Sequence, residues 1–404
     1  MKTIALVDGL LGRQHVVHMR NYAEVLLGIG CRVVELLPDP LPVDHWIDER
    51  LPDRRDSLHC SAFTDEKIVS PVWRLREIYV PLVRWRRLRR AVRVAEQTTG
   101  WKVDVVFLCW LDDYLMDAMP RFRFLLPRVF PYRWSGVYYH PWHLRAPSGE
   151  DIARSQGSEN VLKAKGCISV AVLDEKVADE LAANTGRTVV PFPDETDDRL
   201  PAAEPDLVAR IRQLAGGRKT IGLLGNMSKR KGVLSLLDVA EQCADRDWFF
   251  VFAGEFDEAV KNTFQPAELD RLERAAGKGL PNAFFHMDRI PDDRVFNAVI
   301  KACDALFAAY EMFAHSSGIV TKAAVFGKPI LVSRGFCMEE RVREYSMGLA
   351  VEAGDAREVT DALECVLDEA AFHARVGRPR FDECATAHSV EALKPAFKRI
   401  INLV

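Results

Sequence analysis

The sequence predicts an α/β fold with two doubly wound units, each a parallel sheet between layers of helices. Two observations lead to this class. The chain has 404 residues, which exceeds the length that one hydrophobic core usually serves. Short runs rich in β-branched and aromatic residues alternate with helical patterns throughout, which favours parallel sheets with crossover helices on both faces.

The first unit is expected to span residues 1–200. It begins with the apolar run Thr3–Val7, and the Asp8 and Gly9 that follow it do not fit the pattern of a signal peptide. The other strands expected in this unit are Cys31–Leu37, Val103–Leu108, Gly136–Tyr139, Gly166–Val172 and Thr188–Pro191.

The second unit is expected to span residues 201–385. The segment before it is rich in proline, acidic residues and glycine, as interdomain connections are. The expected strands are Thr220–Leu224, Trp248–Ala253, Ala283–His286, Ala305–Ala308 and Pro329–Ser333. Residues 386–404 include an amphipathic pattern, so we expect a final helix that returns to the first unit.

Composition excludes several classes of protein. The formal net charge of -3 gives no overall attraction to nucleic acid or membranes, and no apolar run is long enough for a membrane span. The nine cysteines include no CxxC pair, which indicates reduced thiols and argues against a zinc site or a disulfide framework. The sequence therefore predicts a cytoplasmic protein.

A glycine, three consecutive cations and a helix start follow one strand of the second unit, in the segment IGLLGNMSKRKGVLSLL. Gly225 permits close backbone approach, Lys231 supplies positive charge, and the N–H groups of the helix point outward. This combination predicts an anion site. A solvated basic turn is the alternative.

A second helix start follows the strand Ala305–Ala308, in the segment AHSSGIVTKAAVFGKP. Ser316 or Ser317 can cap this helix, and the N–H groups of Ser317, Gly318 and Ile319 then face any ligand in front of it. An ordinary helix cap without a ligand is the alternative.

These segments resemble the family 4 glycosyltransferases, the glycosyl transferases group 1. The first, GNMSKRKG, has the spacing of that family's G-R-L-x-x-x-K-G. The second takes the place of E-G-F-G-x-x-x-x-E-A-M-A-x-G-x-P, and a third, SMGLAVEAGD, is similar to the family's G-x-x-v-x-x-G-D. The resemblance covers residues 219–370 and implies the GT-B architecture, two Rossmann-like domains facing a central cleft.

The resemblance assigns donor-binding roles to individual residues. Lys231 matches the lysine that binds the donor diphosphate, near Gly225, and the amides of Ser317 and Gly318, next to Ser316, match those that cradle it. Asn226 stands where the family has an arginine, so Lys229 or Arg230 is expected to supply that charge. Asp288, Arg289 and Ile290 are the candidates for contact with the nucleobase.

The paired glutamates of the family are absent. Ala314 takes the place of the first and Lys322 that of the second. Glu311 is the candidate to replace the first glutamate, with a solvated loop acid as the alternative. Lys322 is a candidate for a further cation near the phosphates.

Two sets of residues in the first unit complete the expected site. His140 matches a family histidine that touches the donor sugar, although Pro141 replaces the aspartate that usually follows. Arg13, His15 and His18 follow the first strand, where the family has its acceptor loop. A structural role for these histidines is the alternative.

Eight arginines and a single acidic residue, Glu77, lie within residues 73–93. This basic amphipathic stretch suits an anionic membrane surface or a polyanionic acceptor, with a solvated helix face as the alternative. The arginines expected to contact a membrane peripherally are Arg84, Arg86, Arg87, Arg89 and Arg90.

The resemblance implies a hexosyltransferase that moves a sugar from a UDP- or GDP-sugar to a glycan, lipid-linked or small-molecule acceptor, in glycan or cell-envelope polysaccharide biosynthesis. No cofactor is expected, and no paired carboxylates lie near the predicted diphosphate site, so no metal is expected either. Two alternatives remain open: a non-catalytic relative that binds a nucleotide-sugar or a partner protein, and a nucleotide-sugar epimerase.

Overall fold

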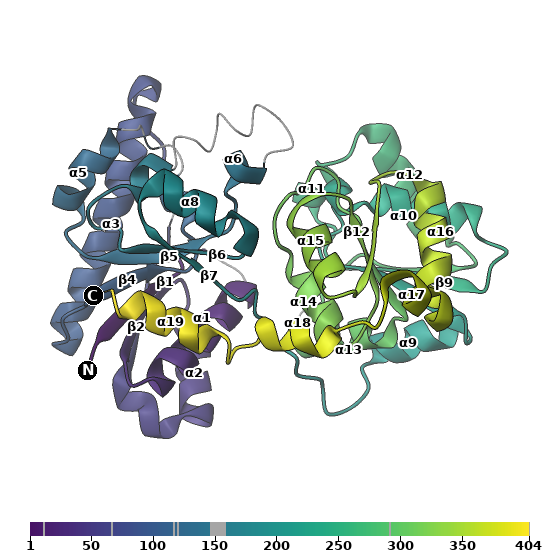
Figure 1. Ribbon diagram of the computed structural model, residues 1–404, viewed down its shortest axis with the longest axis horizontal. Helices are drawn as coiled ribbons and strands as arrows, with labels where there is room; N and C mark the ends of the chain where they lie inside the picture. Colours follow the sequence, from purple (N-terminus) through teal and green to yellow (C-terminus); the bar gives the residue numbers. More distant parts are fainter. Residues whose placement is uncertain are drawn as a thin grey trace. The chain divides into compact units, whose positions relative to one another are not determined.

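The computed structural model describes residues 1–10, 13–65, 68–115, 118, 121–145, 159–290 and 292–403, and the backbone alone for residues 13–15. The chain forms two compact units, drawn in Figure 1. The first contains Met1–Glu195 together with Ser389–Val404, and the second contains Thr196–His388. Each unit is built on its own parallel sheet, so the predicted α/β class is confirmed.

The sheet of the first unit has seven parallel strands within the described residues, in the order β3-β2-β1-β4-β5-β6-β7. Sequence patterns did not predict β3, an edge strand that pairs with β2. The strands are β1 (Thr3–Val7), β2 (Arg32–Leu37), β3 (Leu58–Ala62), β4 (Val105–Leu108), β5 (Trp134–Tyr138), β6 (Ser169–Val172) and β7 (Thr188–Pro191).

Helices connect these strands and cover both faces of the sheet (Figure 1). Those with α-helical geometry are α1 (Arg13–Gly28), α2 (Leu41–Arg50), α3 (Arg76–Thr99), α4 (Asp112–Leu115), α5 (Phe122–Val129), α6 (Trp142–Arg145), α8 (Ala178–Thr185) and α19 (Leu393–Ile401). Three short 3₁₀ turns are η1 (Pro52–Ser57), η2 (Trp73–Leu75) and η3 (Glu175–Val177).

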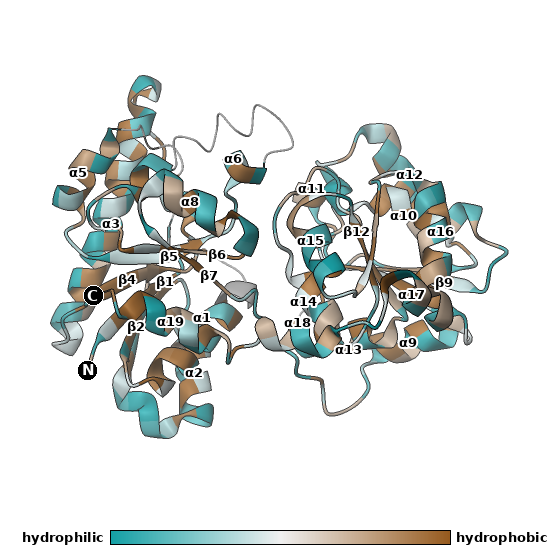
Figure 2. Cartoon of the chain, viewed as in Figure 1, coloured by the Kyte–Doolittle hydropathy of each residue, from teal (hydrophilic) through white to brown (hydrophobic). Residues whose placement is uncertain are grey.

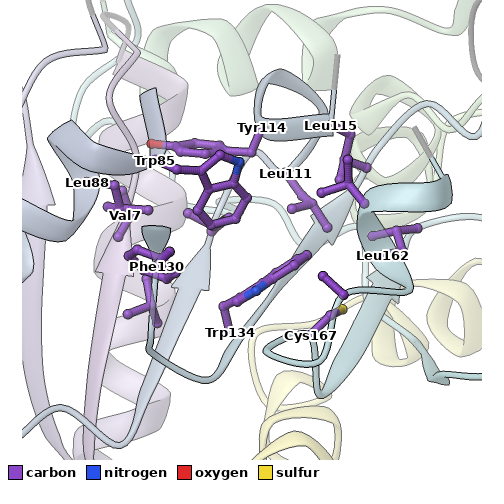
Figure 3. Packing of buried hydrophobic residues seen from close by; sticks show 14 of the residues in the cluster. Val7, Trp85, Leu88, Leu111, Tyr114, Leu115, Phe130, Trp134, Leu162 and Cys167 are labelled. Carbon is purple, nitrogen blue, oxygen red and sulfur yellow. The ribbon is translucent and has the colours of Figure 1, made fainter. Parts of the chain in front are cut away.

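Large aromatic side chains fill the core on one face of this sheet (Figure 3). Trp85 of α3 is fully buried, and its ring centroid lies 5.1 Å from that of Trp134 and 5.0 Å from that of Phe130. Burying a large apolar side chain contributes about 1.5–3 kcal/mol, so these contacts fix α3 firmly on the sheet.

The C-terminal helix α19 completes the core on the other face. Its Phe397 is buried, with ring centroids 5.2 Å from Phe107, 5.3 Å from Phe192 and 5.5 Å from Tyr22. The last helix of the chain therefore packs with residues of the first unit, although the second unit separates them in sequence.

The sheet of the second unit has six parallel strands within the described residues, in the order β10-β9-β8-β11-β12-β13. The edge strand β13 was not predicted from the sequence. The strands are β8 (Lys219–Leu224), β9 (Trp248–Ala253), β10 (Ala283–His286), β11 (Ala305–Ala308), β12 (Ile330–Ser333) and β13 (Gly348–Val351).

Helices again cover both faces of the second sheet, and each mixes apolar and hydrophilic residues (Figure 2). Their buried apolar residues pack with those of the strands in two core clusters. They are α9 (Asp206–Ala215), α10 (Val233–Gln242), α11 (Glu258–Lys261), α12 (Pro266–Lys278), α13 (Asp293–Ala302), α14 (Gly318–Val325), α15 (Phe336–Glu344), α16 (Ala356–Leu367), α17 (Glu369–Val376) and α18 (Phe381–Ala387), with a 3₁₀ turn η4 (Lys229–Lys231) before α10.

Candidate functional site

The strand order of the second sheet defines where a ligand is expected. The chain winds outward from β8 through β9 to β10, then returns to β11 beside β8 and continues in the other direction. Open α/β sheets bind ligands at such a reversal, outside the carboxyl ends of the strands. The loops after β8 and β11 meet there, and they carry the predicted residues Gly225–Lys231 and Glu311–Gly318.

Close backbone contact shapes the loop after β8. Gly225 has a φ of 104° and donates its N–H to the carbonyl of Ala253 at 3.0 Å. Beside it, a Cβ atom on Gly254 would lie 1.6 Å from the carbonyl oxygen of Gly225, so Gly254 cannot carry a side chain here. The Asn226 side-chain oxygen accepts the N–H of Ser228 at 3.0 Å, which gives Asn226 a part in the turn itself.

Lys231 joins the two loops. Its ammonium donates to the hydroxyl of Tyr310 at 2.6 Å and lies 4.2 Å from the centroid of the same ring. It also lies 4.0 Å from the position that a Cβ atom on Gly225 would take, so it sits in front of the glycine turn. Tyr310 is buried after β11, and sequence reasoning did not identify it. The aromatic residue two positions after the end of that strand was the available signal.

Arg230 makes a second set of contacts between the loop after β8 and the loop after β11. Its guanidinium lies 4.6 Å from the ring centroid of Phe313, and its carbonyl accepts the N–H of Glu311 at 2.8 Å. Arg230 therefore holds the β11 loop against the β8 loop, and a role in binding the donor stays a prediction.

Lys229 is directed to another partner. Its ammonium lies 2.6 Å from the carboxylate of Glu268, and its N–H donates to the hydroxyl of Thr263 at 3.1 Å. The Glu268 contact raises the pKa of Lys229. This pairing favours Lys231 over Lys229 as the cation for a ligand at this edge.

Glu311, the candidate replacement for the first family glutamate, lies half-buried at the start of the β11 loop. Burial raises the pKa of its carboxyl group, while Lys229 acts in the opposite direction and Glu268 raises it further. A carboxyl group in this setting is suited to hydrogen bonding with a sugar or ribose hydroxyl. Its catalytic role stays a prediction.

The start of α14 presents its backbone without a side-chain cap. Ser317 occupies the cap position with an extended backbone (φ -140°, ψ 127°) and makes no capping hydrogen bond with its side chain. The Ser316 hydroxyl instead accepts from the buried Arg341 at 2.7 Å, a residue of α15 that sequence reasoning did not identify. Arg341 thus positions the residues just before the helix, while the amides of Ser317 and Gly318 stay candidates for an anion.

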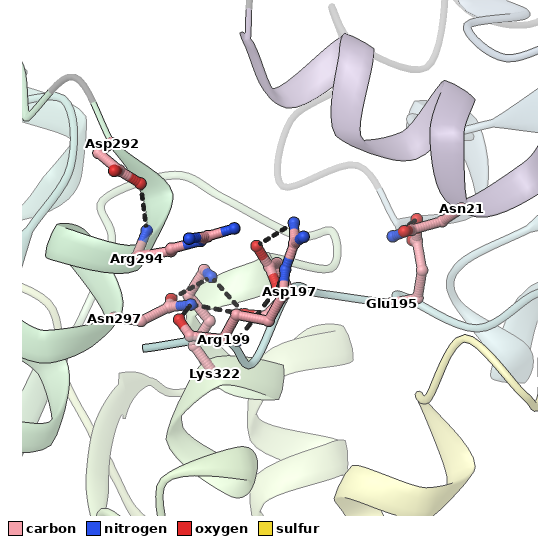
Figure 4. A network of polar contacts seen from close by, with 8 residues as sticks. All are labelled: Asn21, Glu195, Asp197, Arg199, Asp292, Arg294, Asn297 and Lys322. Carbon is pink, nitrogen blue, oxygen red and sulfur yellow. Dashed lines mark hydrogen bonds and ion pairs between the residues drawn. The ribbon is translucent and has the colours of Figure 1, made fainter. Parts of the chain in front are cut away.

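Lys322 has a structural role in this arrangement. Its ammonium donates to the side-chain oxygen of Asn297 at 2.6 Å and to the carbonyl of Asp197 at 3.2 Å (Figure 4). Burial lowers the pKa of Lys322, and nearby carboxylates including Asp293 and Asp197 oppose that effect. The hydrogen bonds tie α13 and α14 to the segment that begins the second unit. A donor-binding role for Lys322 stays a prediction that would require these bonds to break.

The predicted nucleobase contacts lie after β10. Asp288 and Arg289 are exposed, whereas Ile290 is half-buried and packs against a core cluster of the second unit. This loop leaves the same edge of the sheet as the loop after β8, with β9 between the two strands.

In the first unit, Asp112 holds His140 in place. The Asp112 carboxylate accepts hydrogen bonds from the backbone N–H of His140 at 2.9 Å and from that of Tyr139 at 2.8 Å. The ring Nδ1 of His140 also lies 2.9 Å from this carboxylate. Because a carboxylate can only accept, this contact places a proton on Nδ1. The ring of Trp142 stacks on His140 with centroids 5.7 Å apart. Asp112 was not among the predicted site residues, although the acidic pair after β4 was visible in the sequence.

Of the predicted acceptor residues, the described part of the chain includes the His18 side chain, whereas those of Arg13 and His15 lie outside it. His18 Nδ1 lies 2.7 Å from the carboxylate of Glu195. Burial alone lowers the pKa of His18, but attraction to Glu195, Asp194 and Asp8 outweighs burial and raises the pKa to about 9. This pairing stabilises the first unit below pH 6.5, and the contribution is lost as the pH rises through 9.

The arginine stretch divides between structural and exposed residues. Arg84 pairs with Asp65 at 2.9 Å, and Arg89 donates to the carbonyls of Arg128 and Val129 at 3.3 Å. These two are half-buried, whereas Arg86, Arg87 and Arg90 are exposed along α3.

No helix in the described residues is long and apolar enough to cross a membrane. The same residues include no group of three metal-ligating side chains.

Replacing Tyr310 with phenylalanine should test how Lys231 is positioned. Loss of the hydroxyl removes the acceptor of its ammonium, so Tyr310→Phe should weaken binding of an anionic ligand at this turn by roughly two- to ten-fold, the effect of one hydrogen bond, with UDP as the probe. Isothermal titration calorimetry of Tyr310→Phe, Lys231→Met and the double variant is the measurement. Strictly additive effects would contradict coupling between the two residues.

The protein has two Rossmann-like units. In the second unit, a basic glycine turn and the loop that leads to α14 meet at the strand reversal. These features define a GT-B fold. Residues 218–369 match the family model of glycosyl transferases group 1, which confirms the predicted resemblance in the second unit. A search of curated protein sequences found no match.

Solved structures match the whole chain. HepE from Anabaena in complex with UDP has a TM-score of 0.68 at 13% identity, with 100% of both chains covered. Sucrose-phosphate synthase from Thermosynechococcus elongatus has a TM-score of 0.67 at 16% identity, covering 100% of this chain and 98% of that one. MnaA from S. aureus with UDP has a TM-score of 0.63 at 13% identity, covering 100% and 98%. At these identities, the matches establish the fold.

Proposed function

We propose that this protein is a hexosyltransferase that takes its sugar from a UDP-sugar, binds the donor diphosphate at the strand reversal of the second unit, and transfers the sugar to a glycan, lipid-linked or small-molecule acceptor. The observation that carries the proposal is the placement of the Lys231 ammonium between the glycine turn at Gly225 and the loop that leads to α14.

The arrangement suits departure of a nucleoside diphosphate. As the bond between sugar and phosphate breaks, negative charge builds up on the diphosphate, and fixed donors stabilise it more than they stabilise the ground state. Lys231 and the amides at Ser317 and Gly318 are the proposed donors. A second HepE structure has UDP-glucose bound, which supports testing UDP-glucose first and GDP-sugars afterwards.

One observation favours a second function, nucleotide-sugar binding without transfer. Ala314 is buried in the position of the first family glutamate and Lys322 is hydrogen-bonded into the protein scaffold in the position of the second. A chain without either carboxylate could keep the diphosphate site and lose turnover. The transferase proposal therefore depends on Glu311 to take the place of the missing first glutamate.

Ligand screening followed by a turnover assay separates the two functions. A thermal-shift screen of UDP, GDP, ADP and their sugars should give the largest stabilisation with a UDP compound, because a ligand that binds the folded state raises apparent stability. Release of UDP from the matching UDP-sugar, followed by chromatography, then separates an enzyme from a binder. If no nucleoside diphosphate stabilises the protein, both functions are wrong.

Replacing Ser317 with alanine should have little effect on binding. The proposed contact uses the backbone N–H, and the Ser317 side chain makes no capping hydrogen bond, so Ser317→Ala should weaken UDP binding by about 1 kcal/mol or less. Gly318→Val places a β-branched side chain at the proposed contact and should weaken binding far more. Calorimetric titration of both variants makes the comparison, and equal losses would argue against a backbone contact.

A further inference from the structure

The segment that leads into α3, together with the first turn of that helix, carries a concentration of exposed apolar side chains that the donor site does not explain. Among the described residues, six of the fifteen exposed large hydrophobic side chains lie between residues 69 and 79. We call this group the apolar tip, and its members are Val69, Val72, Trp73, Leu75, Ile78 and Tyr79. Trp73 is 79% exposed, a large deviation from the usual burial of tryptophan.

The fold holds the apolar tip away from the core. Further along α3, Trp85 and Leu88 are fully buried against the sheet, which anchors the helix. Before Val80, by contrast, every residue from 71 to 79 is exposed. Figure 1 shows this end of α3 projecting at the top of the first unit, beyond its other helices. A firmly anchored helix therefore presents an apolar end to the surroundings.

The charges beside the apolar tip are positive. Arg74 and Arg76 lie between the residues of the apolar tip in the sequence, and Arg86 and Arg90 are exposed further along α3. Glu77 is the single acidic residue between positions 68 and 95. The Arg74 guanidinium lies 5.4 Å from the ring centroid of Trp73, so cation and aromatic ring occupy one surface.

We propose that the apolar tip inserts into the headgroup region of an anionic lipid bilayer, with the exposed arginines of α3 on the lipid phosphates. Tryptophan and tyrosine favour the interface between water and hydrocarbon, and arginine can extend its charge to the headgroups while its aliphatic part stays among apolar groups. Each nearby arginine adds attraction to an anionic leaflet. A projecting end enters a deformable bilayer readily, whereas a protein partner needs a matching pocket.

This surface differs from the one predicted from the arginines alone. Arg84 and Arg89 make contacts within the first unit, so their charges hold α3 in place. The membrane contact shifts to the start of the helix, where apolar side chains supply insertion and Arg74, Arg76, Arg86 and Arg90 supply the electrostatic attraction.

Cosedimentation with lipid vesicles tests the proposal on the full-length protein. The protein should pellet with phosphatidylcholine vesicles that contain phosphatidylserine, more weakly with phosphatidylcholine alone, and more weakly again when ionic strength rises from about 0.1 to about 0.5 M. Trp73→Ser combined with Leu75→Ser should lower the partition coefficient roughly ten-fold or more, because both side chains lose their insertion into lipid.

Matched variants separate insertion from general effects. Leu214→Ser removes an exposed leucine of α9 in the second unit and should leave partitioning unchanged. Arg86→Gln combined with Arg90→Gln should lower binding to anionic vesicles and reduce its salt dependence. Thermal unfolding and UDP binding should stay at wild-type values in all these variants. No sedimentation of the wild type, equal binding to neutral vesicles, or full binding by the Trp73 and Leu75 double variant would each overturn the proposal.

Discussion

Lys231→Met should weaken UDP binding by roughly 1.5–3 kcal/mol, equivalent to about 10- to 150-fold in Kd, while the protein stays folded. The ammonium lies at the meeting point of the loops after β8 and β11, where Tyr310 holds it at 2.6 Å. Methionine keeps most of the volume of the side chain and removes the charge. The loss therefore measures the charge-assisted contact with the diphosphate together with the Lys231–Tyr310 hydrogen bond, and comparison with Tyr310→Phe separates the two. Isothermal titration calorimetry with UDP gives the affinity.

The neighbouring Lys229→Met is the matched control. It removes the same charge two residues earlier, but that charge is paired with Glu268. Its UDP affinity should stay within about two-fold of wild type, since the Lys229 ammonium is already engaged by Glu268 and such a half-buried pair is not proposed to contact the ligand. If Lys229→Met lost more affinity than Lys231→Met, or if Lys231→Met bound UDP normally, the diphosphate would bind elsewhere.

The architecture could be predicted from the sequence because its signals are local. Buried strands such as Trp248–Ala253 are continuous apolar runs, and the glycine turn at Gly225 lies directly between a strand and a helix. The strands that were missed, β3 and β13, both lie at sheet edges and are partly exposed. An edge strand has a partner on one side and needs less apolar character, so its pattern is weaker.

The predicted site residues depend on contacts that a sequence cannot reveal. Lys231 stands out in a basic run, but its partner Tyr310 lies 79 positions away. Lys322 and Arg341 have the charge expected of phosphate-binding residues, yet each is hydrogen-bonded within the second unit, to Asn297 and Ser316 respectively. Tertiary packing decides which of these cations is available to a ligand and which forms hydrogen bonds within the protein. The residue type alone does not distinguish the two roles.

Raising the pH from 5 to 8.5 should destabilise the protein through Glu35, a residue of β2 in the interior of the first unit. Its side chain is fully buried, and neither carboxyl oxygen has a hydrogen-bond partner among the described residues. Burial raises the pKa of Glu35 from 4.5 to about 8, with Arg20 opposing the shift and Asp44 adding to it. At neutral pH the folded protein therefore keeps this carboxyl group protonated, whereas the unfolded chain ionises it.

The sign of the effect follows from proton binding. Between pH 4.5 and 8 the folded state holds a proton that the unfolded state has released, so the free energy of unfolding falls as the pH rises through this range. Above the folded pKa both states are ionised, and this residue causes no further change. Between pH 5 and 8.5 the loss is on the order of 4 kcal/mol, a large share of the stability of an ordinary domain.

Glu35→Gln should remove most of this pH dependence. Glutamine resembles the protonated acid in shape and polarity, so the variant and the wild type should have similar free energies of unfolding near pH 5, and the variant should gain increasingly toward pH 8.5. Urea unfolding at pH 5, 7 and 8.5 gives the free energies of unfolding of both proteins. The difference between the two values at each pH cancels the contribution of His18 and of other groups. Glu24→Gln on α1 is the control, because Glu24 is exposed and its hydration changes little on folding. A constant difference between Glu35→Gln and wild type across the three pH values would show that Glu35 keeps the same charge in the folded and unfolded states.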